Sequence, residues 1–173
     1  MILVRHGQTI FNVVYGSTRQ DPGVADPELT EEGRGQADAA ADSLARNGIE
    51  LVIASPYRRA LQTARIIAGT LGVAVLIDER ARERCAFSCD VGSPRSHLAR
   101  TWPELDFSAL AETWWPKDEE PEARFARRCE IFAIHWSADP RWDRIAAITH
   151  WGVIRALTGQ HVANGSLTRL ARR

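Results

Sequence analysis

The sequence predicts an α/β domain built in three layers, α/β/α, with helices on both faces of a mostly parallel central sheet. Four short runs are almost wholly apolar, which is typical of strands that are covered on both faces. Helical patterns lie between these runs, and this alternation of strands and helices favours a parallel sheet. We expect the strands at residues 2–4, 51–54, 74–77 and 145–148.

The first helix is expected to begin after Thr30, whose hydroxyl can accept a hydrogen bond from a free backbone N–H. Two glutamates follow in the first turn, where negative charge is favourable. Alanines and a leucine then recur on one face of the helix. Asn47-Gly48 ends the pattern, because glycine readily adopts the left-handed conformation that closes a helix.

Ser55-Pro56 predicts the start of a second helix, with Ser55 as the N-terminal cap and proline at the first helical position. The apolar face of this helix extends to Leu71, and Gly72 ends it. A third helix is expected at about residues 121–138, where aromatic and aliphatic residues recur as one stripe. We interpret that stripe as part of the hydrophobic core.

Two stretches do not fit the alternation of strands and helices. Residues 11–27 are rich in Gly, Pro and Asp and are expected to form a long loop. Residues 85–120 have a mixed pattern and are expected to form a divergent lid or insertion. Trp114 and Trp115 fall in this segment, and a place in the core or an interface is favoured over contact with a substrate. The length of 173 residues predicts one domain, 1–173.

The charge balance limits the classes of partner. Lysines and arginines number 22, as do aspartates and glutamates, so no broad basic field favours nucleic acid.

No apolar run is long enough for a membrane span, and the chain opens with no leader pattern. Three cysteines, an odd number, indicate free thiols in the cytoplasm. No feature predicts the oligomeric state, although an oligomer is possible.

Chemistry-bearing residues follow three of the predicted strands. Arg5 and His6 follow the first strand, Ser55 and Arg59 the second, and His150 the fourth. In open α/β sheets, ligands bind beyond the carboxyl ends of the strands. Guanidinium groups are suited to phosphate, and a helix N-terminus favours anions. No metal-ligand spacing occurs among these residues.

These blocks resemble the histidine phosphatase superfamily, also called the phosphoglycerate mutase-like family. The first is Arg5-His6-Gly7-Gln8-Thr9 with Asn12, and the second is Ser55-Pro56-Tyr57-Arg58-Arg59-Ala60-Leu61-Gln62-Thr63-Ala64. The third is Thr149-His150-Trp151-Gly152. The blocks occur in the order of the family and span nearly the whole chain. The resemblance implies a phosphoglycerate mutase-like fold over a single domain.

The resemblance also implies roles for the matching residues. His6 would be the nucleophile that forms a phosphohistidine, and Arg5, Arg59 and His150 would surround the phosphoryl group. Asn12 would be a lesser ligand of that group. Since His6 must be neutral to attack, we expect a backbone carbonyl to accept from its other ring nitrogen. The resemblance implies no metal and no cofactor.

The family uses an acidic residue to protonate the leaving oxygen. Glu83 matches that position best, Glu79 is the alternative if the register slips by four residues, and Asp90 is the next candidate. The family's usual Gly-x-x-Glu-Gly turn is missing, and residues 87–94 stand in its place. This departure does not affect the matching residues of the three blocks, but the family pattern no longer indicates which substrate is bound.

We therefore expect a metal-independent phosphomonoesterase that acts on a small phosphorylated metabolite. An intramolecular phosphate mutase is the alternative, but the chain has little room for the extra segments of such mutases. A non-catalytic module that binds a phosphorylated ligand is a third hypothesis. It is disfavoured because both histidines, both arginines and a candidate acid are present.

Overall fold

The computed structural model describes residues 1–172 and contains a five-stranded sheet in the order β3-β2-β4-β1-β5. β5 pairs antiparallel with β1, and the other neighbours are parallel. The strands are β1 (Ile2–Arg5), β2 (Leu51–Ala54), β3 (Ala74–Ile77), β4 (Ile145–Thr149) and β5 (Leu167–Arg169). The four predicted strands are thus confirmed to within one residue at each end.

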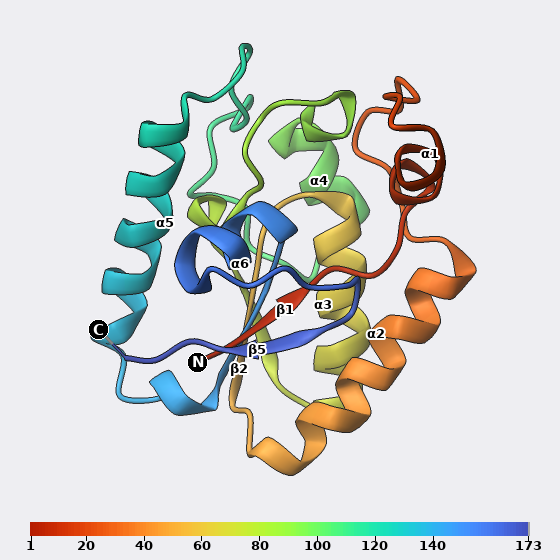
Figure 1. Cartoon of the computed structure of the whole chain (residues 1–173). Coiled ribbons are helices and arrows are strands. Elements are labelled where there is room, and N and C mark those ends of the chain that lie inside the picture. Colours follow the sequence, from red (N-terminus) through yellow and green to blue (C-terminus); the bar gives the residue numbers. More distant parts are fainter. Residues whose placement is uncertain (173) are drawn as a thin grey trace.

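Helices cover both faces of the sheet, which confirms the three-layer α/β/α fold (Figure 1). α2 and α3 pack on one face, and α5 and α6 pack on the other. The helices are α1 (Ile10–Thr18), α2 (Glu31–Leu44), α3 (Arg58–Leu71), α4 (Arg95–Thr101), α5 (Glu122–Ser137) and α6 (Trp151–Thr158). Within residues 1–172, none of them has the length and apolar character needed to cross a membrane.

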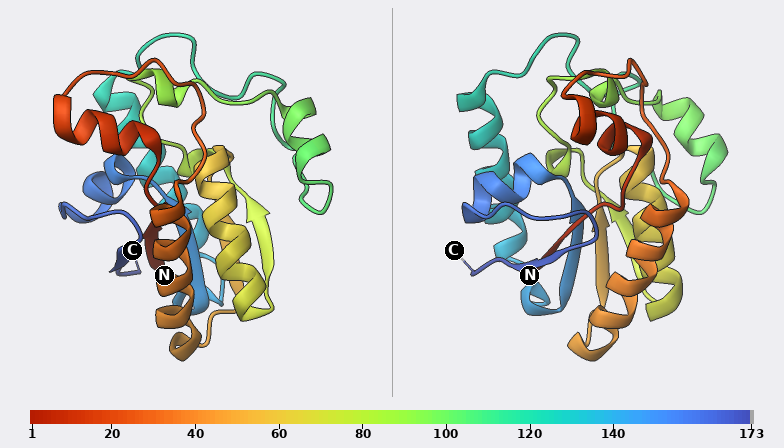
Figure 2. Two further views of the ribbon diagram at one scale, coloured as in Figure 1. Left: turned by 90° about the vertical axis from the view of Figure 1, so that its right-hand side faces the viewer. Right: turned by 45° about the vertical axis from the view of Figure 1, so that its right-hand side comes forward.

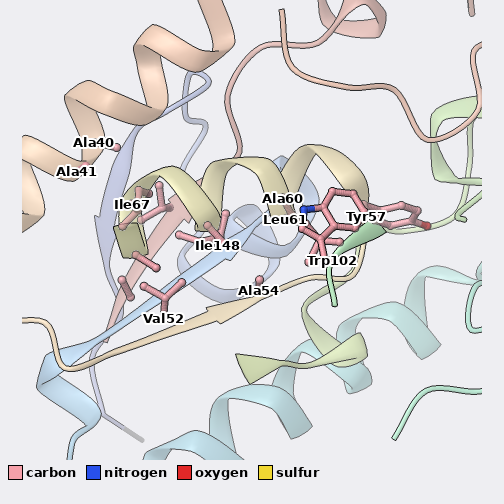
Figure 3. Close-up of a cluster of buried hydrophobic side chains, with 14 of the residues drawn as sticks. Ala40, Ala41, Val52, Ala54, Tyr57, Ala60, Leu61, Ile67, Trp102 and Ile148 are labelled. Atoms are coloured by element: carbon pink, nitrogen blue, oxygen red, sulfur yellow. The ribbon is translucent and has the colours of Figure 1, made fainter. Parts of the chain in front are cut away.

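The apolar residues of the central strands alternate between the two layers of helices. Val52 and Ala54 of β2 face the cluster that contains Leu61 and Ile67 of α3, as Figure 3 shows. Their neighbours Leu51 and Ile53 belong to the cluster on the opposite face. Because successive strand residues point to opposite faces, one continuous apolar run serves both layers.

β3 differs from this pattern because it is the edge strand. Its residues alternate between exposed and half-buried, and Leu76 is 43% exposed. The expectation that all four strands are covered on both faces is therefore wrong for β3. A position at the edge depends on strand order, which an apolar run of four residues does not reveal.

The long loop expected at residues 11–27 is interrupted by α1, so that expectation is wrong in part. The side chain of Thr9 accepts from the backbone N–H of Asn12, and Asn12 accepts from the N–H of Thr9. This reciprocal capping box begins the helix. The chain leaves α1 at Arg19, which has a positive φ of 59°.

The helix predicted to start at Ser55-Pro56 is α3, which begins at Arg58 with Tyr57 as its N-cap. The predicted cap at Ser55 is therefore wrong. The hydroxyl of Ser55 instead contacts a ring nitrogen of His150 across the sheet. This long-range contact takes the side chain away from the helix start.

The segment 85–120 contains a 3₁₀ turn, Ser88–Asp90, and the short α4. Figure 2 shows it at the same end of the molecule as α1. Several of its side chains join the core beside α3, namely Leu98, Trp102, Phe107, Leu110 and Trp114. Trp114 is 5% exposed, and its ring lies 4.7 Å from that of Tyr57, centroid to centroid. Trp114 therefore contributes to the core, as favoured from the sequence.

The loop that carries His6 is pressed against α2. A Cβ added to Gly7 would lie 2.1 Å from the carbonyl oxygen of Gly33, and one added to Gly33 would lie 2.1 Å from the carbonyl oxygen of Gln8. The backbone N–H of Gly7 also donates to Oγ1 of Thr63 on α3, at 3.1 Å. Only two facing glycines permit this approach, so α2 and α3 together fix the loop after β1.

We predict opposite effects of alanine at two glycines of α2. Alanine normally stabilises a helix interior over glycine by roughly 0.5–1 kcal/mol. Gly35→Ala should raise the free energy of unfolding by that amount, because its Cβ meets nothing within 4 Å. Gly33→Ala should lower it by about 1–3 kcal/mol through overpacking against the His6 loop. Urea denaturation of both variants measures the difference, and equal stabilisation would contradict the close contact.

Candidate active site

The parallel register brings three strand ends together. β1 and β2 both pair with β4, and Arg5 lies opposite Thr149. The pairing continues one residue beyond each strand, because the N–H of His6 donates to the oxygen of Thr149 at 3.0 Å. The N–H of Ser55 likewise donates to the oxygen of Ile148 at 3.1 Å. The residues that follow β1, β2 and β4 therefore emerge side by side.

His6 is a buried, neutral imidazole with one ring nitrogen committed. Its Nδ1 lies 2.7 Å from the carbonyl oxygen of Gly7, and a carbonyl can only accept, so Nδ1 carries the hydrogen. This is the backbone acceptor expected from the sequence. Burial, reinforced by the positive charges of Arg59 and Arg5, lowers the pKa of His6 well below 6.5. The unprotonated Nε2 is therefore the ring nitrogen with an available lone pair.

His150 lies against His6, with ring centroids 5.0 Å apart, and it is fully buried. Its Nε2 lies 2.8 Å from Oγ of Ser55, while its buried Nδ1 has no hydrogen-bond partner among the described residues. A hydroxyl both donates and accepts, so either tautomer of the ring makes this contact, and Nδ1 carries the hydrogen in the tautomer in which Ser55 donates to Nε2. Burial first, then Arg59 and His6, lower the pKa of His150 well below 6.5. This ring is thus neutral, and its Nδ1 is the nitrogen without a partner among the described residues.

Two arginines supply positive charge beside these rings. Arg5 donates from Nη1 to the oxygen of Val162 at 2.7 Å, and its buried Nε is without a partner within residues 1–172. Arg59 is 3% exposed and donates from Nη1 to the oxygen of Cys89 at 2.7 Å. Its Nη2 donates to Oδ1 of Asp90 at 3.1 Å. Each guanidinium is anchored to the protein and retains further N–H groups for an anion.

Glu83 lies at the N-terminus of α6, directly beside the His150 block. Its Oε2 accepts from the N–H of Gly152 at 2.9 Å, and its Oε1 accepts from the N–H of Arg84 at 2.8 Å. Burial, with the negative charge of Asp90, raises the pKa of Glu83 above 4.5, although these two hydrogen bonds oppose the shift. A Cβ on Gly152 would lie 2.2 Å from Oε1, so this approach requires glycine.

Glu79 and Asn12, also predicted from the sequence, have different surroundings. Glu79 is exposed on the 3₁₀ turn Glu79–Ala81 that follows β3. Asn12 uses its side-chain oxygen to accept from Thr9 and, at 3.3 Å, from Nδ2 of Asn164. The same Nδ2 donates to the carbonyl oxygen of His6 at 3.0 Å. The structure therefore brings Asn12 toward His6 and leaves Glu79 at the surface.

A buried ionic network, which the sequence did not reveal, holds the segment that carries Glu83. The carboxylate of Glu120 is 2% exposed and accepts from Arg82 at 2.9 Å and from Arg128 at 2.5 Å. Arg128 on α5 also donates to the carbonyl oxygens of Arg80, Arg82 and Glu83. Arginine and glutamate are common on exposed helix faces, so no local signal distinguishes Glu120, Arg82 and Arg128.

Comparisons with known proteins bear on this arrangement. The family model described as histidine phosphatase superfamily (branch 1) matches residues 1–172. The glucosyl-3-phosphoglycerate phosphatase of Mycobacterium tuberculosis (strain CDC 1551 / Oshkosh) is 33% identical over 174 residues, covering 91% of this chain and 73% of that protein. Phosphoglycerate mutase-like protein 4 of Arabidopsis thaliana is 32% identical over 162 residues, covering 91% and 68%.

A solved structure is similar in fold as well as sequence. It is that of a mycobacterial glucosyl-3-phosphoglycerate phosphatase in complex with VO3, with 30% sequence identity and a TM-score of 0.67. The match covers 96% of this chain and 88% of that chain. Within residues 1–172, no three or more His, Cys, Asp or Glu side chains are grouped so that they could hold a metal ion.

We predict that Glu120 matters far more for stability than its neighbour Glu119. Removing one partner of a buried ionic network leaves uncompensated charge, so Glu120→Ala should lower the free energy of unfolding by about 3–5 kcal/mol. Glu119 pairs with Arg84 at the surface, and Glu119→Ala should cost less than about 1 kcal/mol. Guanidinium denaturation compares the two variants. Similar small losses would show that the network contributes little.

Proposed function

The chain belongs to the histidine phosphatase superfamily and is a phosphoric monoester hydrolase, and we propose that it acts through a phosphohistidine on His6. One observation carries this proposal. His6 is neutral, its Nδ1 contacts the backbone and leaves Nε2 available, and the charges of Arg59 and Arg5 act on the ring. A nucleophile must be unprotonated, and the transferring phosphoryl group needs positive charge around it. Burial together with these two arginines supplies both conditions.

The proposed reaction has two displacements. Nε2 of His6 attacks phosphorus, the bond between phosphorus and the ester oxygen breaks, and the leaving oxygen takes a proton from Glu83. Water then attacks the phosphohistidine, and the Glu83 carboxylate accepts the proton that the water releases. The P–N bond breaks with its electron pair returning to His6, so one ester and one water give one alcohol and one phosphate.

Fixed donors would stabilise the charge on the equatorial oxygens in both steps. Arg5 and Arg59 contribute guanidinium N–H groups, and we propose the His150 tautomer in which Ser55 donates to Nε2, so that Nδ1 contributes an N–H as well. Asn12 is proposed as a lesser ligand, since Asn164 connects it to the backbone of His6. Because arginines provide the positive charge, we propose that the reaction needs neither a metal ion nor a cofactor.

We propose a small phosphorylated metabolite as substrate, and neither nucleic acid nor membrane as partner. The name of the mycobacterial relative, glucosyl-3-phosphoglycerate phosphatase, supports this class of substrate, and the VO3 in a related structure supports a site for small oxyanions. The equal numbers of acidic and basic residues provide no broad positive field for a polyanion. All three cysteines are free thiols, which supports a site of action in the cytoplasm.

The choice of metabolite is proposed to depend on the segment that departs most from the family pattern. This segment is residues 85–120, and we propose that it is a divergent lid or insertion of the single domain 1–173. It lies at the same end of the molecule as α1 in Figure 2. Its turn at residues 88–90 contacts Arg59 directly, which supports a position at the edge of the phosphoryl site.

A phosphate mutase is the second candidate. The name of the Arabidopsis relative, phosphoglycerate mutase-like protein 4, favours it. The mycobacterial relatives, similar in both sequence and structure, favour the hydrolase. A mutase would return the phosphoryl group from His6 to an organic acceptor, whereas the hydrolase transfers it to water.

We predict that His6→Ala abolishes turnover and that the unaltered enzyme can be trapped as a phosphoenzyme labelled on His6. The label should be acid-labile and base-stable, because it is a phosphoramidate rather than an ester. Rapid quenching with ³²P-labelled substrate, followed by peptide mapping, locates it. His97 is exposed on α4, so His97→Ala serves as the matched control and should retain activity.

A label on Ser55 or on a cysteine would contradict the assignment. The fate of the label also separates the two candidate reactions. Release as inorganic phosphate is expected for the hydrolase. Accumulation of an isomeric phosphate ester faster than phosphate release would establish a mutase instead.

We predict that Glu83→Gln impairs hydrolysis of alkyl phosphates by roughly 10²–10⁴-fold and spares p-nitrophenyl phosphate much more. An alkoxide leaving group needs a proton, whereas a nitrophenolate hardly needs one. The exposed Glu79 is the matched control, and Glu79→Gln should be mild on both substrates. Steady-state rates of the two variants on both substrates give the comparison. A leaving-group-dependent loss in Glu79→Gln alone would move the acid to that residue.

The pH profile should differ between the substrates for the same reason. The pKa of Glu83 is raised, so its proton persists above pH 4.5 and is lost as the pH rises through the shifted value. Hydrolysis of alkyl phosphates should therefore fall on that alkaline side, while hydrolysis of p-nitrophenyl phosphate falls less. The acid limb due to His6 should lie well below pH 6.5, because its pKa is lowered.

A further inference from the structure

Asp90 lies in residues 87–94, the stretch that departs from the family pattern, and its carboxylate is 1% exposed. Oδ1 accepts from Nη2 of Arg59 at 3.1 Å and from Sγ of Cys89 at 3.6 Å. Oδ2 accepts from the backbone N–H groups of Ala86 and Phe87, both at 3.2 Å. Both oxygens are thus occupied, and the carboxylate is tied to the backbone of its own turn.

The same turn holds Arg59 at further points. The carbonyl oxygen of Cys89 accepts from Nη1 of Arg59 at 2.7 Å. The ring of Tyr57 lies 4.3 Å from Cζ of Arg59, and the hydroxyl of Tyr57 donates to the carbonyl oxygen of Asp90 at 2.7 Å. The guanidinium is therefore enclosed by a carboxylate, a carbonyl and an aromatic face, all fixed relative to one another.

We propose that Asp90 is a positioning residue, which holds the guanidinium of Arg59 in the orientation that presents its remaining N–H groups to the phosphoryl oxygens. This inference rests on the proposed function, in which Arg59 binds the phosphoryl group. An arginine side chain has many rotamers, and catalysis is sensitive to small displacements of a donor. The carboxylate of Asp90 contacts only one of the two terminal nitrogens, so it fixes the planar group without occupying it as a bidentate pair would.

Asp90 and Glu83 contact different groups. The carboxylate of Asp90 pairs with the guanidinium of Arg59. The carboxylate of Glu83 accepts instead from the backbone N–H groups of Gly152 and Arg84. We therefore assign the two carboxylates different tasks, one in positioning Arg59 and one in proton transfer.

A substitution at Asp90 can also act without moving Arg59, either through its own turn or through Glu83. Asp21 provides the control for the turn, because it accepts from the N–H of Ser88 at 2.8 Å and from the Ser88 hydroxyl. No hydrogen bond or ion pair among the described residues joins Asp21 to Arg59. The substrate p-nitrophenyl phosphate removes the route through Glu83, because its leaving group hardly needs a proton.

The test is a double-mutant cycle on kcat/KM for p-nitrophenyl phosphate. Asp90→Asn should lower kcat/KM by on the order of 10–100-fold in the otherwise unaltered enzyme. In an Arg59→Ala background the same change should alter it by less than about twofold, because the group that Asp90 positions is gone. Asp21→Asn should change kcat/KM by less than about twofold in the unaltered enzyme. Circular dichroism confirms that each variant is folded.

Equal fold losses from Asp90→Asn in both backgrounds would overturn the proposal, and so would wild-type kcat/KM in the single variant. A loss confined to alkyl phosphates would overturn it too, since Asp90 would then act through Glu83. If Asp90→Asn does not fold, Tyr57→Phe replaces it, because this change removes only the hydroxyl that supports Asp90. It should lower kcat/KM severalfold, again only when Arg59 is present, and an equal loss without Arg59 would overturn the proposal.

Failure of the proposed function would look different. The unaltered enzyme would then release no phosphate from p-nitrophenyl phosphate or from other phosphate monoesters. An active unaltered enzyme with an additive cycle would instead reject only the role of Asp90.

Discussion

The guanidinium of Arg59 and the imidazoles of His6 and His150 are buried together beside Arg5, and much of the structure follows from this burial. A buried cation is costly unless acceptors surround it. For Arg59 these acceptors are the carbonyl of Cys89 and the carboxylate of Asp90. Burial first, and then these two arginines, disfavour a proton on either histidine. In the proposed mechanism, the buried positive charges that bind the phosphoryl group therefore also help to keep His6 neutral for attack.

The sheet makes this arrangement possible by placing β4 between β1 and β2. Their backbone pairing continues past the strand ends, which fixes where His6 and Ser55 emerge. The turn of residues 88–90 then accepts a hydrogen bond from Arg59. Arg128 of α5 donates to the backbone of the segment that contains Glu83 and so holds that segment in place. The strands thus fix where the backbone of each site residue lies, and the irregular segments provide the hydrogen-bond partners of the side chains.

Much of the fold can be predicted because the signals are local. Four apolar runs predict the four parallel strands, and Thr30 caps the first long helix as expected. The misses depend on tertiary structure. The sequence neighbours of Ser55 favour a helix cap, yet its hydroxyl contacts His150, 95 residues away. The exposure of Leu76 follows from its place in an edge strand.

The candidate site likewise combines features that have a local sequence signal with features that depend on tertiary structure. Strand ends predict that His6, Arg59 and His150 gather, and the structure places them together. The roles of Asp90 and Glu120 in holding arginines have no local signal in the sequence. Their partners Arg59 and Arg128 lie 31 and 8 residues away, respectively, and only the folded chain orients each carboxylate toward its guanidinium.

The contact between Glu83 and Gly152 also couples these two positions during evolution. Any side chain at position 152 would overlap the carboxylate of Glu83, since even its Cβ would lie 2.2 Å from Oε1. The overlapping atoms are the far end of a flexible side chain, so a substitution at 152 would displace the carboxylate rather than the backbone. The effect of a substitution at 152 on the reaction should therefore depend on the residue at 83, and the two positions should show epistasis.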